Sequence, residues 1–111
     1  MNWTKIKEKN PKAFEKCSEF LKQYEFHYGE WFCKKTGVGM NYYIERDLFS
    51  FFDEQGIYIE VYVLGINDDF TASDWQYDIA NERIEEIDYP TRTLAEEQAY
   101  EKAFPILEEK L

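Results

Sequence analysis

The chain has 111 residues, of which 44% are hydrophobic and 19% aromatic, and it carries a formal net charge of −10. This length predicts one domain over residues 1–111, and the aromatic content excludes an intrinsically disordered chain. The charge is uneven, because residues 1–35 hold eight Lys and five Glu, while residues 36–111 hold five Lys or Arg and eighteen Asp or Glu. So acidic a body repels phosphate, and we expect no direct binding to nucleic acid.

Targeting segments and cysteine spacing further limit the classes of protein to which the chain can belong. No stretch approaches the roughly eighteen apolar residues of a membrane span, and the N-terminal residues lack the apolar run of a signal peptide. Cys17 and Cys33 form no Cys-x-x-Cys or Cys/His grouping, so neither a disulfide framework nor a zinc site is expected. We therefore expect a cytoplasmic protein with reduced thiols and no cofactor, which does not bind membranes.

The first part of the chain predicts helices. Thr4 is a candidate cap for a short helical turn, and Asn10 followed by Pro11 is a strong helix start, since Asn caps well and Pro suits the first helical position. Apolar residues then recur at three- and four-residue spacing, which is typical of one amphipathic helix over residues 11–25. These apolar residues are Phe14, Cys17, Phe20, Leu21 and Tyr24.

The middle of the chain changes character. Residues 26–45 are rich in aromatic residues and glycine and hold no period, so we expect a loop with some extended structure there. A short helix is then predicted over residues 46–56, with Gly56 at the left-handed position that ends many helices.

Three β-strands are predicted next. Residues 57–64 are rich in β-branched and aromatic side chains and predict the central strand of a sheet. Residues 74–80 alternate apolar and polar side chains, which is typical of a half-buried strand. A weaker third strand is predicted over residues 84–89, and it ends at Pro90 because proline has no N–H to donate.

The last element is a helix. Thr91 or Thr93 starts it, and Glu96 completes a capping-box pattern with Thr93. Pro105 lies inside it and is expected to kink it. The fold class that follows is α+β, with a three-stranded antiparallel sheet, a meander, covered by helices in the order α-α-β-β-β-α.

No catalytic, cofactor-binding or metal-binding residue is predicted. Cys33 lies beside two lysines that favour its thiolate, and His27 is the candidate base for it. A thiol enzyme or a small ligand-binding protein that uses residues 26–40 therefore stays the alternative hypothesis. The acidic residues near Asp68 and Asp78 are interpreted as solvated turn residues, because the calcium-binding EF-hand pattern is missing.

Acidity and surplus aromatic residues together suggest a protein-binding surface, since such rings anchor interfaces well. The candidate residues are Trp31, Tyr42, Tyr43, Asp74, Trp75, Tyr77 and Asp78. We expect a non-enzymatic interaction module that docks on a basic protein, either as a monomer or as a homodimer paired through a sheet edge. One version is a nucleic-acid mimic, which requires acids spaced regularly over one face.

Two segments carry a resemblance. Residues 46–59 read Arg-Asp-Leu-Phe-Ser-Phe-Phe-Asp-Glu-Gln-Gly-Ile-Tyr-Ile, and residues 91–104 read Thr-Arg-Thr-Leu-Ala-Glu-Glu-Gln-Ala-Tyr-Glu-Lys-Ala-Phe. They resemble small uncharacterised proteins of Bacteroides-type genomes and their phages or prophages, and the terminal helix is also similar to a small phage α-β-α sandwich protein. The resemblance implies a fold class and a phage or prophage origin, and it brings no activity and no functional residue.

Overall fold

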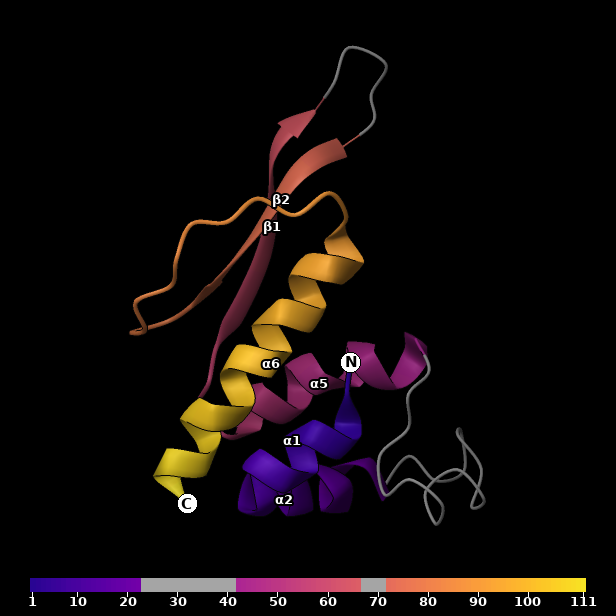
Figure 1. Ribbon diagram of the computed structural model, residues 1–111, viewed down its shortest axis with the longest axis vertical. Coiled ribbons are helices and arrows are strands. Elements are labelled where there is room, and N and C mark those ends of the chain that lie inside the picture. The colour runs from indigo at the N-terminus through magenta and orange to yellow at the C-terminus, as the bar shows by residue number, and fades with distance from the viewer. Residues whose placement is uncertain (23–41, 67–71) are drawn as a thin grey trace.

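The computed structural model describes residues 1–22, 42–66 and 72–111, and Figure 1 shows their arrangement. These residues form four helices and one two-stranded antiparallel sheet, which confirms the α+β class. The elements are α1 Trp3–Lys9, α2 Pro11–Lys22, α5 Tyr42–Glu54, β1 Ile59–Ile66, β2 Ala72–Ile79 and α6 Arg92–Lys110. Helices α1, α2 and α5 gather at one end, while α6 runs diagonally beside the β1–β2 pair (Figure 1).

Helix α1 starts earlier than predicted. The side-chain oxygen of Asn2 accepts the backbone N–H of Lys5 at 3.0 Å, so Asn2 is the N-cap and the prediction for Thr4 is wrong. Trp3 and Ile6 on this helix are buried. Because short helices depend on packing more than on propensity, the burial of these two side chains decides where the helix begins.

Helix α2 begins at Pro11, as predicted. Phe14, Cys17 and Leu21 on its apolar face are buried, which confirms the amphipathic pattern within the described residues. Burial raises the pKa of the Cys17 thiol, because the thiolate would lose its hydration. Cys17 therefore acts as a small core residue and not as a nucleophile.

Helix α5 confirms one prediction and corrects another. It begins at Tyr42, so the prediction of a loop through residue 45 is wrong. Its end is as predicted, since Gly56 has a φ of 77°. The N–H of Ile57 donates to the carbonyl of Phe52 at 2.8 Å, and the N–H of Gly56 donates to the carbonyl of Asp53 at 3.1 Å. These two bonds form the Schellman motif that ends a helix on a left-handed residue.

Aromatic rings from three helices form the centre of the core. The ring of Phe52 lies 5.1 Å from that of Phe104 and 6.2 Å from that of Tyr100, between centroids. Trp3 meets Phe104 edge-on at 5.9 Å. All four rings are buried, so α6 is the element that joins α1 and α5 into one core.

Within residues 1–22, 42–66 and 72–111 the sheet consists of β1 and β2, and the prediction of a three-stranded meander is wrong. The register runs from Ile59 opposite Ile79 to Ile66 opposite Ala72. Strand β1 was predicted to be central, but it lies at the edge of this pair. The strand alternation in residues 74–80 is confirmed by β2, in which Ile79 is buried and Asp78 exposed.

The predicted third strand is reduced to a single bridge. Tyr89 exchanges two backbone hydrogen bonds with Trp75, at 2.8 and 2.9 Å, and residues 84–88 are not a strand. Pairing cannot extend beyond this bridge, because Pro90 has no N–H and the chain enters α6 at Arg92. Before the bridge, residues 84–88 form no backbone hydrogen bond with β2, so a single bridge remains.

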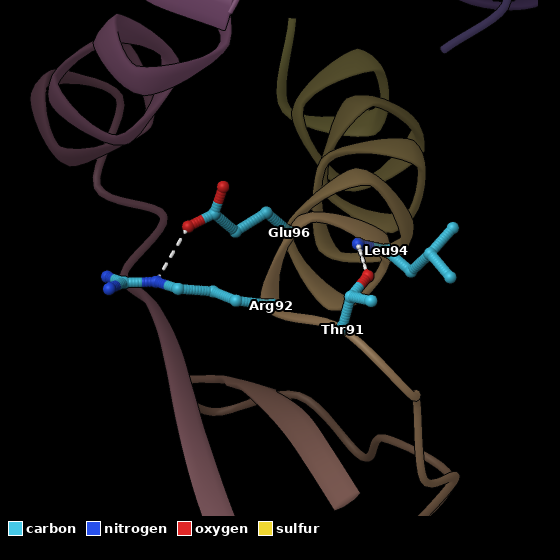
Figure 2. A network of polar contacts seen from close by, with 4 residues as sticks. All are labelled: Thr91, Arg92, Leu94 and Glu96. Atoms are coloured by element: carbon cyan, nitrogen blue, oxygen red, sulfur yellow. Dashed lines mark hydrogen bonds and ion pairs between the residues drawn. The ribbon is translucent and has the colours of Figure 1, made fainter. Parts of the chain in front are cut away.

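Helix α6 starts at Arg92, with Thr91 as its N-cap, and continues through Pro105 to Lys110. The Thr91 hydroxyl accepts the backbone N–H of Leu94 at 3.2 Å, as Figure 2 shows. The capping box of Thr93 with Glu96 is wrong, because Glu96 instead pairs with Arg92 at 3.0 Å (Figure 2). Of the two predicted starts, the structure selects Thr91.

Candidate functional site

Four of the predicted surface residues lie on β2, but on its two opposite faces. Trp75 and Tyr77 point to the inner face of the sheet, which we define as the face beside α6: the guanidinium carbon of Arg92 lies 5.9 Å from the centroid of the Trp75 ring. Asp74 and Asp78 are exposed on the outer face, the side away from α6. The strand thus separates the aromatic candidates from the acidic ones.

The remaining predicted residues do not belong to β2. Tyr42 and Tyr43 belong to the first turn of α5, and Trp31 lies outside the described residues. His27 and Cys33 also lie outside them, so the alternative hypothesis of a thiol or ligand site over residues 26–40 stays a prediction.

A chain of side-chain hydrogen bonds crosses the outer face. The Tyr62 hydroxyl on β1 donates to Oε1 of Gln76 on β2 at 3.1 Å, and Nε2 of Gln76 donates to Oδ1 of Asp88 at 2.6 Å. Gln76 is 9% exposed although it lies on a face predicted to be polar. Its amide is satisfied at both ends, which is the condition for burying such a group. Together with the two backbone bonds between Tyr89 and Trp75, these bonds hold residues 88–89 beside β2.

Carboxylates gather around Tyr62 on the outer face. The pKa of Tyr62 is raised by burial and then by the negative charges of Asp78, Glu86 and Glu60. All three acids are exposed, and within the described parts of the chain none of them forms an ion pair. We call Glu60, Asp78 and Glu86 the acidic face. This group of acids was not predicted from the sequence. Glu60 lies on β1, and only the strand register places it opposite Asp78.

A hollow of about 260 Å³ lies on the inner side, between β2, residues 85–89 and α6. The stacked rings of Tyr77 and Tyr89, 6.1 Å apart, form one wall. The pKa of Tyr77 is raised by burial and then by the charges of Tyr89, Glu101 and Glu85. Glu85, Glu101 and the cation Lys102 all line this hollow, so it carries charges of both signs.

Residues 85–89 alternate between the two sides. Glu85, Ile87 and Tyr89 line the hollow, whereas Glu86 acts on Tyr62 and Asp88 bonds to Gln76 on the outer face. The two-residue period that predicted a strand is thus present, although the hydrogen-bond ladder is not. This segment therefore places a carboxylate on each side of the sheet, Glu85 on the inner side and Glu86 on the outer side.

Two observations on the described residues concern metal-binding and thiol groups. These residues contain no group of three or more His, Cys, Asp or Glu side chains that could hold a metal ion. Cys17, the cysteine within them, is buried. None of the helices in the described segments is both long enough and apolar enough to cross a bilayer.

Comparison of the chain with protein-family models, with curated proteins and with solved structures gives no match. Function is therefore inferred from the surface of this chain.

Proposed function

We propose that this chain is a non-enzymatic interaction module that binds a basic protein through its acidic face. The observation that carries the proposal is the set of three exposed carboxylates around Tyr62, which have no cationic partner among the described residues. Unpaired surface charge of one sign raises the local concentration of an oppositely charged partner and speeds its association.

The neighbouring rings add contact area to this charge. Tyr62 lies on this same face and is half-buried, so part of its ring remains available to a partner, and aromatic rings are enriched where interfaces gain most of their affinity. Tyr58 and Leu64, on or beside β1, are 57% and 58% exposed. The surface therefore offers apolar contacts beside the carboxylates.

The test compares two triple variants with the same net charge. In the first, Glu60→Gln, Asp78→Asn and Glu86→Gln neutralise the acidic face. In the second, Glu15→Gln, Glu19→Gln and Glu109→Gln neutralise three exposed acids on α2 and α6. The probe is a peptide of eight lysines, and its Kd is measured by calorimetry at low salt. We expect the first triple to weaken binding by about tenfold or more, and the second to weaken it much less.

Equal weakening by the two triples would contradict the proposal, because binding would then follow net charge and not the position of the acids. Failure of the parent protein to bind the peptide would also contradict it. Circular dichroism of all three proteins serves as the folding control.

The proposal includes a phage or prophage origin and a cytoplasmic location. The resemblance of residues 46–59 and 91–104 supports the origin, and the buried free thiol of Cys17 is compatible with a reducing compartment. Recovery of the natural protein from the membrane or extracellular fraction of its host would contradict the location.

A further inference from the structure

The direction of the backbone groups along β1 follows from one hydrogen bond. The N–H of Ala80 donates to the carbonyl of Tyr58 at 2.9 Å, so this pair is a hydrogen-bonded one. In an antiparallel pair, successive residues turn their backbone groups alternately toward the partner strand and away from it. The N–H and C=O of Ile59, Val61 and Val63 therefore point away from β2.

The same alternation holds on β2. Trp75 lies opposite Val63, and its backbone groups point away from β1 to bond Tyr89 on the far side. The far edge of β2 is thus partly occupied. The outward groups of Ile59, Val61 and Val63 have no such partner among the described residues.

Apart from the charge of Glu60, strand β1 carries none of the features that usually protect an edge. Strands at sheet edges usually carry Lys, Pro or a bulge that discourages pairing with another chain. The sequence of β1, Ile-Glu-Val-Tyr-Val-Leu-Gly-Ile, contains neither Lys nor Pro, and its pairing with β2 keeps one register from Ile59 to Ile66. Among the residues that the structure describes, β1 is therefore left as a template for one more strand.

We infer that an extended basic segment of a partner protein pairs with the free edge of β1 as a third strand. This inference rests on the proposed function and names the form of the basic partner. Outer-face side chains of the added strand would lie next to Glu60, about 5 Å away, with Asp78 one strand further on. Inner-face side chains would lie next to Ile59, Val61 and Val63.

The side chains on the two faces of β1 determine which residues the added segment should carry. Lys or Arg suits the outer side, because Glu60 lacks a cationic partner within the described residues. Apolar residues suit the inner side, because their neighbours on β1 are Ile and Val. The segment therefore alternates basic and apolar residues. A second copy of this chain is disfavoured as the occupant, since each copy carries a net charge of −10.

The test uses the peptide Lys-Val-Lys-Val-Lys-Val-Lys and two methylated forms with the same charge. One carries N-methyl groups on its valines and the other on its lysines, so each loses the N–H groups of one edge only. Antiparallel pairing with valines inward uses the valine N–H groups. We expect the valine-methylated peptide to lose at least about tenfold in Kd, while the lysine-methylated peptide keeps the parent affinity.

Equal affinity of all three peptides would overturn edge pairing and leave binding to the acidic face intact. No binding of the unmethylated peptide would overturn edge pairing too, and the octalysine experiment would then decide the proposed function separately. Sedimentation velocity of the protein alone is the last control. A dimer that the unmethylated peptide dissociates would assign the edge to a second copy and overturn the inference.

Discussion

A single side chain, Gln76, shows how the third segment is attached to the sheet. Its amide accepts from Tyr62 and donates to Asp88, so one buried residue connects β1, β2 and residues 85–89. The alternation of β2 placed Gln76 on a polar, solvated face. It is buried because its neighbours satisfy its hydrogen bonds, and a linear sequence does not state which neighbours those are.

Tyr77 supports a prediction about alkaline pH. Its pKa is raised above the ordinary value of 10.0 by burial and by the charges of Tyr89, Glu101 and Glu85. Since the unfolded chain then loses this proton first, the contribution of Tyr77 to stability is complete below about pH 10 and is lost as pH rises through the folded-state pKa. We expect Tyr77→Phe to lose less stability than the parent as the pH rises above about 10.

Urea unfolding at several pH values measures this difference. The absorbance of tyrosinate near 295 nm, compared between the parent and Tyr77→Phe, reports the titration directly. In denaturant the difference spectrum should titrate near the ordinary value, and in buffer at higher pH. Identical midpoints in the two solvents would show that the folded environment does not disfavour ionisation of Tyr77.

At the scale of the elements, the C-terminal end of α5 was predicted correctly, whereas the third strand was not. Gly56 predicted the end of α5 correctly, because a left-handed residue at a helix end depends only on one glycine and its local hydrogen bonds. The third strand was wrong, although its alternation of sides is real. Alternation depends on the local extended backbone, whereas a strand also needs a ladder with a distant partner.

The cap of α6 gives an element-scale prediction with a matched control. Thr91→Ala removes the hydroxyl that accepts the N–H of Leu94, and we expect a loss of about 1 kcal/mol in the free energy of unfolding. Thr93→Ala changes the same residue type two positions on, inside the helix, where Ala has the higher propensity. It should leave stability unchanged or slightly higher.

Urea denaturation of the two variants measures both values under the same conditions. A larger loss for Thr93→Ala than for Thr91→Ala would restore Thr93 as the cap and contradict the start of α6 described above.

The charge of the whole molecule determines its response to salt. The net charge of −10 is carried mainly by the sequence after residue 35, and the acids around Tyr62 lie close together without ion pairs in the described structure. Salt shortens the range of such repulsion from about 30 Å at 0.01 M to about 8 Å at 0.15 M. Raising NaCl between these concentrations should therefore raise the Tm.

The triple variant Glu60→Gln, Asp78→Asn and Glu86→Gln should show a smaller rise in Tm than the parent and than the Glu15, Glu19, Glu109 triple. Scanning calorimetry at the two salt concentrations measures it. A rise of the same size in all three proteins would mean that repulsion is spread evenly and is not concentrated at the acidic face.

Sequence alone determined the features that depend on near neighbours along the chain. The amphipathic face of α2, the end of α5 at Gly56, the alternation of β2 and the acidity of the second part of the chain all follow from residues within a few positions of one another. Each rests on a period, a cap or a count, which distant contacts do not change.

Tertiary structure alone decided the rest. In the acidic face, strand register brings Glu60 opposite Asp78, and Glu86 lies close enough to act on the same tyrosine, Tyr62. The hollow brings Tyr77 of β2 beside Glu101 of α6. The number of strands was decided in the same way, since only Tyr89 of the predicted third strand pairs with β2, through its bridge to Trp75. These features depend on which distant segments pack together, and burial and hydrogen bonding over the whole chain select that arrangement.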